Sequence, residues 1–184
     1  MKHLQGFTLV ELLVTVAIIG ILAAVASPSL LQTLANQRMK SAAYDLNATF
    51  SEARYQAALQ RITMNVSTTG TTSQWKAPNS SKKADIHWQL VPAGSTTPLL
   101  QSSVDSRVSI TSNLDSLSAL FLQNGMVDVV MSSSTATKPD RFFFRVCDEA
   151  VNGEQGYTVV LGRVGGSRVY VGKFGTGVGA QTCT

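Results

Sequence analysis

The chain has 184 residues, of which 14% are charged, and a formal net charge of +4. This length allows one domain with a sizeable core, or one domain with a protruding element, and argues against two ordinary domains. So small a net charge does not by itself indicate a nucleic-acid partner, which would need clustered cations. Few charges with abundant Gly, Ser and Thr favour an exported, strand-rich protein over a cytosolic helical enzyme.

Residues 7–26 form a long apolar segment that only Thr8, Glu11 and Thr15 interrupt. As a helix, a segment of this length spans about 30 Å, the thickness of the hydrocarbon layer of a bilayer. Lys2 precedes it, so the positive-inside rule places the N-terminus in the cytoplasm and the rest of the chain outside.

Two ordinary interpretations of this segment leave one residue unexplained. A secretory signal peptide would be cut after Ala26, where Ala24-Val25-Ala26 resembles a small-residue cleavage site before Ser27. A plain membrane anchor would need no special residue at either end. Neither explains Glu11, because a carboxylate inside an apolar segment costs a few kcal/mol and needs a partner.

The third interpretation rests on residues 6–11, which read Gly-Phe-Thr-Leu-Val-Glu before the apolar run. This motif resembles the class III signal of type IV prepilins and type II secretion pseudopilins. The resemblance implies that a prepilin peptidase removes residues 1–6 by cutting between Gly6 and Phe7, and methylates the new N-terminus on Phe7. It also implies that Glu11 pairs with the N-terminal ammonium of a neighbouring subunit inside the fibre, which gives the carboxylate a counter-charge.

An amphipathic continuation of the helix is predicted over residues 29–62, after the membrane and assembly segment of residues 7–28. Apolar residues recur there at steps of three or four, and charged residues fall off that stripe. Gly20 and Pro28 weaken the helix and predict a kink, a feature that the resemblance to pilins also implies. The apolar stripe comprises Leu31, Ala35, Met39, Ala43, Leu46, Phe50, Ala53 and Ala57.

Residues 63–184 are predicted to form a β-rich globular domain with an antiparallel sheet wrapped on the helix. Short runs rich in Val, Ile, Phe or Tyr alternate with Ser, Thr, Gly and Pro. The intervals Thr68–Lys83, Pro92–Ser106 and Ser132–Lys138 are predicted to be exposed loops. The predicted strands are Ile62–Val66, Asp85–Val91, Arg107–Thr111, Met126–Met131, Arg141–Cys147, Tyr157–Leu161 and Ser167–Phe174.

Three further stretches extend the resemblance. Ser51-Glu52-Ala53-Arg54, and later Phe144-Arg145-Val146-Cys147-Asp148 with Gly162-Arg163, are similar to the GspH/FimT group of minor pilins. The resemblance implies an α+β type IV pilin fold, a long N-terminal helix packed against a C-terminal antiparallel sheet domain. It also implies a minor, FimU-like subunit that primes or joins pilus assembly near the tip. A DNA-binding competence pilin of the FimT kind and a GspH-like pseudopilin of type II secretion are the alternatives.

The resemblance also implies a location and partners. The chain would be a single-pass protein of the bacterial inner membrane with a periplasmic C-terminal domain, and later part of an extracellular pilus. Its partners would be major and minor pilins, the prepilin peptidase and the inner-membrane assembly platform.

The two cysteines, Cys147 and Cys183, both lie in the C-terminal quarter. Export removes the reducing pool of the cytosol, so we expect one structural disulfide that ties the tail back onto the sheet. Such a bond closes about 36 residues, worth roughly 3–4 kcal/mol in the chain-entropy model. Two cysteines without nearby histidines do not indicate a metal site.

DNA is a candidate partner because of the C-terminal cations. Arg163, Arg168 and Lys173 have no acidic residue among them, and Tyr170 and Phe174 are interleaved with them. Phosphate contacts with base stacking could follow, whereas a solvated strand is the ordinary interpretation. DNA-binding FimT-like pilins carry a Gly-Arg-x-Arg element, from which the spacing between Arg163 and Arg168 departs. Lys82 and Lys83 form a weaker second patch.

The sequence gives little support to catalysis. His3 belongs to the leader, and His87 lies in a strand-like segment beside Trp88, where packing is the usual role. No nucleophile-elbow, phosphate-loop or zinc motif occurs. We therefore expect a protein that is not an enzyme and that needs no cofactor and no metal.

Overall fold

The computed structural model describes residues 7–68, 87–105, 107–112, 118–129, 139–148, 155–175 and 183, with the side chains of 25–28, Thr68 and His87 left out. Gly6 and the rest of the predicted leader lie outside this range. The chain divides into two compact units, residues 1–34 and residues 35–184. Each unit is described below by itself.

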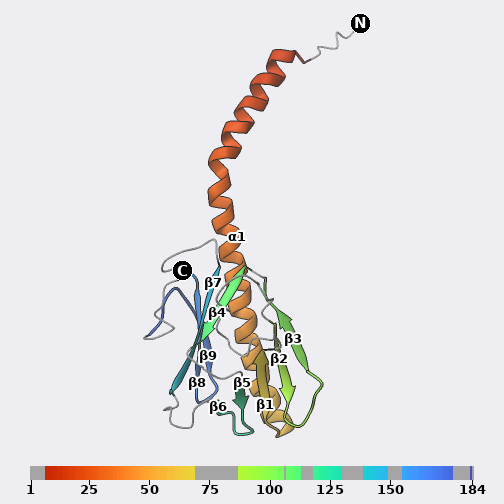
Figure 1. Ribbon diagram of the computed structural model, residues 1–184, viewed down its shortest axis with the longest axis vertical. Helices are drawn as coiled ribbons and strands as arrows, with labels where there is room; N and C mark the ends of the chain where they lie inside the picture. The colour runs from red at the N-terminus through yellow and green to blue at the C-terminus, as the bar shows by residue number, and fades with distance from the viewer. Residues whose placement is uncertain are drawn as a thin grey trace. The chain divides into compact units, whose positions relative to one another are not determined.

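One helix, α1, runs from Leu9 to Gln60 (Figure 1), close to the predicted limits of 7 and 62. It begins directly after Thr8, whose side chain caps it. It ends at Gln60, and the next residue, Arg61, adopts a left-handed conformation with φ of 54°. A residue in this conformation commonly terminates a helix because it turns the backbone away from the helical path.

The part of α1 that belongs to the second unit buries one face. Met39, Ala43, Leu46, Phe50 and the alanines of the same stripe are fully buried, as the helical period predicted. Leu31 was assigned to that stripe but is 55% exposed, so the buried face begins only at Ala35. Small alanines at regular intervals let the helix approach the strands closely.

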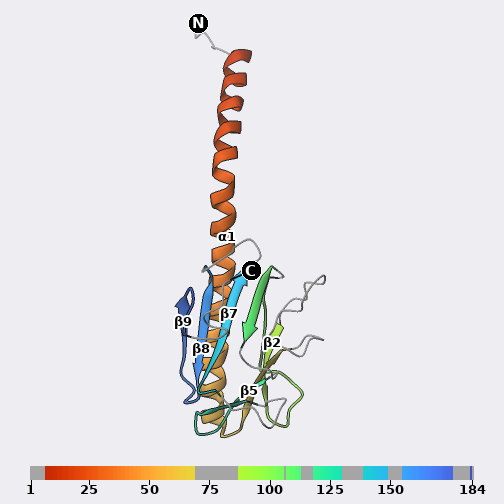
Figure 2. The ribbon, with the colours of Figure 1, turned by 60° about the vertical axis from the view of Figure 1, so that its left-hand side comes forward.

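Two antiparallel sheets pack on this helical segment. Figures 1 and 2 show β8 and β9 on one side of it and β2 on the other. The first sheet has the strand order β3-β2-β1-β5-β6 and the second the order β4-β7-β8-β9. The first sheet comprises β1 (Met64–Thr68), β2 (His87–Pro92), β3 (Leu100–Ser103), β5 (Ser118–Phe121) and β6 (Val127–Val129); the second comprises β4 (Val108–Ser112), β7 (Arg141–Asp148), β8 (Tyr157–Gly162) and β9 (Ser167–Val171).

A single hydrophobic core joins the helix to both sheets. The ring of Phe50 on α1 lies 5.9 Å from that of Phe121 on β5 and 5.0 Å from that of Phe144 on β7. Trp88 on β2 is fully buried, and its Nε1 donates a hydrogen bond of 3.0 Å to Thr49 Oγ1 on the helix. Phe50 of the helix thus packs against an aromatic residue of each sheet and joins the two sheets.

The predicted strands correspond to β1, β2, β4, β6, β7, β8 and β9, with ends displaced by up to three residues. The prediction of Pro92–Ser106 as a loop is wrong, because it contains β3, and β5 was not predicted. Both strands have four residues, too few to display a clear alternation. We expected a single antiparallel sheet, whereas the structure has two. The loops predicted at Ser132–Lys138 and over most of Thr68–Lys83 lie outside the described residues.

Candidate functional site

The N-terminus of α1 combines a helix cap with a lone carboxylate. The Oγ1 of Thr8 accepts a hydrogen bond of 3.3 Å from the backbone N–H of Glu11. A threonine followed three residues later by a glutamate has the spacing of a capping box, a sequence signal for the start of a helix. The Glu11 side chain is exposed and makes no ion pair with any residue in the described part of the chain.

Glu11 lies within a continuous apolar surface. Each side chain described between residues 7 and 24 is exposed, and the large apolar ones are 51–79% exposed, with Phe7 at 79%. Apolar residues occupy consecutive positions, so they surround the helix instead of forming one stripe. A helix that is apolar on all sides is stable only when lipid or other helices cover it. The exposed residues are Phe7, Leu9, Val10, Leu12, Leu13, Val14, Val16, Ile18, Ile19, Ile21 and Leu22.

By length and composition, no single helix in the described residues qualifies as a membrane-crossing helix. Two segments of α1, Leu9–Ala24 and Ser29–Gln60, qualify only when they are taken together as a bent pair. The predicted kink residues are only partly described. A Cβ added at Gly20 would meet no atom within 4 Å, so packing within the chain does not require glycine there. The side chain of Pro28 lies outside the description, and the kink between these residues stays a prediction.

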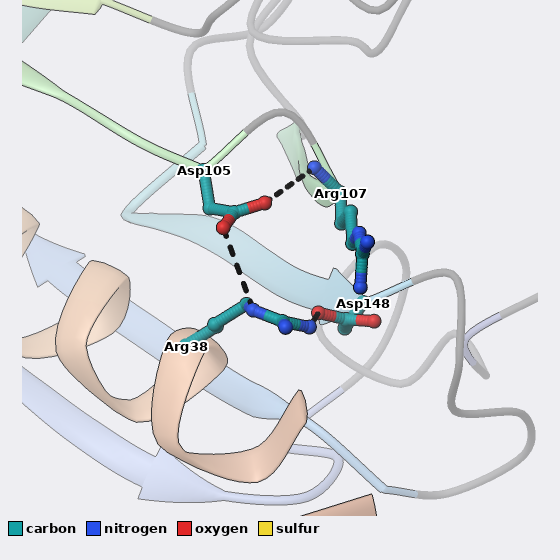
Figure 3. Close-up of polar contacts among 4 residues, drawn as sticks. All are labelled: Arg38, Asp105, Arg107 and Asp148. Atoms are coloured by element: carbon teal, nitrogen blue, oxygen red, sulfur yellow. Dashed lines mark hydrogen bonds and ion pairs between the residues drawn. The ribbon is translucent and has the colours of Figure 1, made fainter. Parts of the chain in front are cut away.

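A charged cluster ties the helix to the strands of the second unit. Arg38 Nε lies 3.4 Å from Asp105 Oδ2, and Arg38 Nη1 lies 3.5 Å from Asp148 Oδ2 (Figure 3). Asp105 also accepts a hydrogen bond of 3.0 Å from the backbone N–H of Arg107. Asp105 lies on the connection between β3 and β4, and Asp148 ends β7. One guanidinium therefore links α1 to the crossover between the sheets and to the second sheet.

A second arginine holds the end of β9. Arg145 on β7 is 1% exposed, and its Nη2 donates a hydrogen bond of 2.6 Å to Gln155 O. Its Nη1 donates to Gly172 O and, at 3.3 Å, to Thr158 Oγ1. Thr158 in turn donates a bond of 2.7 Å to Gly172 O. The buried guanidinium thus donates to one backbone carbonyl before β8 and to another after β9.

The predicted disulfide is confirmed. Cys147 on β7 and Cys183 are bonded, with their Cα atoms 5.5 Å apart. Gly156 lies directly beside this bond with φ of 116°, and a Cβ there would approach Val146 O to 2.6 Å. The disulfide fixes Cys183, the second-last residue, near Gly156, where the guanidinium of Arg145 also lies.

The proposed DNA-contacting residues do not form one patch. Arg163 lies in the turn between β8 and β9, where its Nη1 is 3.7 Å from Asp140 Oδ1. Arg168 is exposed at the start of β9, near this turn, whereas Lys173 lies past the other end of that strand. A strand of this length spans about 17 Å, so Lys173 is remote from Arg163.

The structure adds a third arginine to the end of the sheet that holds Arg163. Arg141, at the start of β7, pairs with Gly162 and is exposed. The aromatic residues are less available than predicted, because Tyr170 and Phe174 stack on each other with ring centroids 3.9 Å apart. Lys82 and Lys83, the second predicted patch, lie outside the described residues.

Other chemistry has little basis in the part of the chain that the structure describes. No three His, Cys, Asp or Glu side chains come together there as metal ligands would.

The sequence did not predict the role of Arg38, which was only one of the charged residues off the apolar stripe. The available signal was a cation one residue before buried Met39, at the edge of the buried face, where a long side chain reaches inward partners.

Comparison with known proteins identifies the N-terminal motif and the class of fold. Residues 1–27 match the model of the prokaryotic N-terminal methylation motif. The α+β fold, a long helix with antiparallel sheets, is that of a type IV pilin, as predicted.

The solved structures similar to this chain include two crystal forms of the type IV minor pilin FimU from Pseudomonas aeruginosa strain PAO1. The form in space group P65 is 18% identical, with a TM-score of 0.51 over 71% of this chain and 91% of that one. The form in space group P21 is 16% identical, with a TM-score of 0.52 over 79% and 92%. No curated protein matches the sequence.

Proposed function

We propose that this chain is a minor type IV pilin, a non-enzymatic subunit that enters a pilus through the N-terminal half of α1. One observation carries the proposal: the N-terminal segment of α1, residues 9–24, is exposed and apolar on all sides and bears a single carboxylate, Glu11, in its capped first turn. That segment lies inside the matched methylation motif. A cover of lipid before assembly and of neighbouring helices afterwards accounts for the apolar surface.

The proposed mechanism begins in the inner membrane. Residues 7–28 anchor the precursor with its C-terminal domain in the periplasm, and the prepilin peptidase cuts between Gly6 and Phe7. The freed and methylated amine of Phe7 is a cation within an apolar environment, and Glu11 is the anion that the same environment disfavours. Pairing between the amine of one subunit and the carboxylate of the next removes both penalties.

This pairing would also set how far each subunit advances along the fibre. Apolar contacts between helices are non-directional and tolerate sliding. A buried ion pair is satisfied at only one offset, and specification of register is the best-attested role of buried polar groups. Glu11 would therefore define the axial position of the subunit, while the surrounding leucines, isoleucines and valines supply most of the cohesion.

The partners that follow are major and minor pilins, the prepilin peptidase and the inner-membrane assembly platform. The similarity to FimU favours a place among pilus-priming, tip-associated minor subunits over a GspH-like pseudopilin of type II secretion. Because the FimU structures are less than 20% identical to this chain, the similarity supports the proposal through the fold.

Mass measurement and fibre analysis test the proposal. The mature protein should begin with methylated Phe7; a mature start at Ser27 would instead show an ordinary signal peptide. Glu11→Ala should be cleaved normally yet be depleted from sheared fibres, because its neighbour's amine then lacks a counter-charge. Thr15→Ala, a polar residue one turn further along, serves as the control and should enter fibres normally. Normal incorporation of Glu11→Ala would remove the pairing mechanism.

A second candidate function, DNA capture for natural transformation, is favoured by one observation. Arg141, Arg163 and Arg168 gather at one end of the second sheet, from β7, the β8–β9 turn and β9. Cations grouped at one edge can contact successive phosphates. The nearby Asp140 reduces this potential, since its carboxylate lies within ion-pair distance of Arg163. We place this function second for that reason.

A further inference from the structure

A hollow lies between α1 and the β2–β3 side of the first sheet. Its volume is about 390 Å³, enough for a long side chain and its neighbour. Thr49 and Leu90 are its buried residues, whereas Asp45 and Glu52 line it from the helix, and Leu99 and Leu100 from the strand side. The hollow thus offers an apolar surface beside two carboxylates.

No cation, neither Lys nor Arg, accompanies the carboxylates of the hollow among the residues that the structure describes in its lining. Asp45 accepts a hydrogen bond from Ser102 Oγ, and Glu52 Oε1 accepts one of 2.7 Å from Gln56 Nε2. Gln60 Nε2 donates in the same way to Gln56 Oε1, at 2.7 Å. These neutral donors orient the acidic groups without neutralising them, so the described lining of the hollow carries a negative charge.

The hollow and a smaller neighbour share the lining residue Asp45, and we call the two together the groove. The smaller hollow has a volume of about 150 Å³ and is lined by Arg38, Ser103 and Asp105 among others. The guanidinium of Arg38 is already engaged by Asp105 and Asp148. β3 is the outer strand of its sheet, and Leu99 beside it is 52% exposed. An elongated groove with an exposed leucine fits a protein segment better than a small ion.

We propose that this groove receives a neighbouring subunit of the fibre, which inserts a Lys or Arg side chain next to an apolar one. The cation would lie between the carboxylates of Asp45 and Glu52, and the apolar side chain against Leu99 and Leu100. Charge complementarity selects this occupant, since the phosphates of nucleic acid or of an anionic lipid would be repelled by both carboxylates. The inference rests on the proposed function, because it assumes that the chain enters a fibre.

Photo-crosslinking in the assembled fibre tests the inference. Leu99 in the full-length chain is replaced by p-benzoylphenylalanine, cells are irradiated, and sheared fibres are analysed by mass spectrometry to identify the linked peptide. The expected result is a link to another pilin subunit, within a few residues of a Lys or Arg. A link to an acidic or uncharged segment, to lipid, or to nothing at all would overturn the inference.

A matched pair of variants then tests the role of charge. Asp45→Asn with Glu52→Gln removes two negative charges from the groove with little change of shape. It should lower the crosslink yield about tenfold, which corresponds to about 1.4 kcal/mol. Ser51→Lys with Ala58→Lys changes the net charge equally on exposed helix positions outside the lining, and should leave the yield unchanged. Equal yields from the two double variants would contradict the inference. Absence of the parent chain from fibres would refute the proposed function itself, whereas fibres without the crosslink refute the groove alone.

Discussion

Arg38 on α1 and Asp148 on β7 are 110 positions apart in the sequence, yet 3.5 Å separates Nη1 of the first from Oδ2 of the second. The arginine side chain is 24% exposed, and the aspartate side chain is fully buried. The same guanidinium reaches Asp105 on the crossover between the sheets. Arg38 is the fourth residue of the second unit, close to the point where the buried face of α1 begins.

We expect Arg38→Met to destabilise the second unit by about 2 kcal/mol, because a buried carboxylate loses a charged hydrogen-bond donor. Denaturant unfolding of the full chain in detergent, followed by tryptophan fluorescence, to which buried Trp88 contributes, would measure the change. Lys40→Met is the matched control, since Lys40 is an exposed cation on the same helix and should change stability by less than about 0.5 kcal/mol. If both variants lose equal stability, the cluster has no special role.

Gly156→Ala should also be strongly destabilising, by about 2–4 kcal/mol. At φ of 116° a side chain is strained, and the added Cβ would lie 2.6 Å from Val146 O and 3.0 Å from Cys183 Sγ. The same unfolding measurement checks it. Gly166→Ala is the control, because a Cβ there meets no atom within 4 Å and its φ lies outside the left-handed region. A Gly156→Ala protein as stable as Gly166→Ala would show that the loop simply moves aside.

The sequence alone predicted features that depend on local pattern. The buried face of α1 follows from the period of Met39, Ala43, Leu46 and Phe50, because a helix brings residues three and four apart onto one side. The strands β7 and β8 were equally predictable, because loops seldom contain apolar runs of that length. The disulfide needed only the export argument, since two cysteines allow a single intramolecular pairing.

Features that depend on distant segments were not predictable in this way. β3 has only four residues, and its pairing with β2 decides that it is a strand. The split into two sheets depends on Asp105 and its neighbours crossing from β3 to β4, which no periodicity reveals. The pairing of Arg38 with Asp148 and the groove around Asp45 likewise arise only when helix and strands come together. Cations that lie close in the sequence can also be far apart in space, since Arg163 and Lys173 lie beyond opposite ends of β9.

Loss of the disulfide should loosen the C-terminal segment. Cys147→Ser with Cys183→Ser removes a bond between residues 36 positions apart, worth about 3–4 kcal/mol in the chain-entropy model. The denaturation midpoint should fall accordingly, and the parent should show the same fall when a reductant is added. The double variant is its own control, because reductant should not change its midpoint further. A parent protein whose midpoint is unaffected by complete reduction would show that the bond adds no stability.

The DNA hypothesis predicts that the arginines at one end of the second sheet contribute to binding, whereas Lys173, beyond the other end of β9, does not. If phosphates contact that end, Arg163→Ala with Arg168→Ala in the full chain should weaken duplex binding and reduce the slope of log affinity against log salt by about 2. Lys173→Ala should leave the slope unchanged, because β9 separates this residue from Arg163, and Lys40→Ala controls for net charge. Fluorescence anisotropy with a labelled duplex at several salt concentrations provides the slopes. A slope that falls equally for every variant would indicate diffuse attraction by the net charge of +4, and absence of binding at low salt would leave pilus assembly as the function that the chain supports.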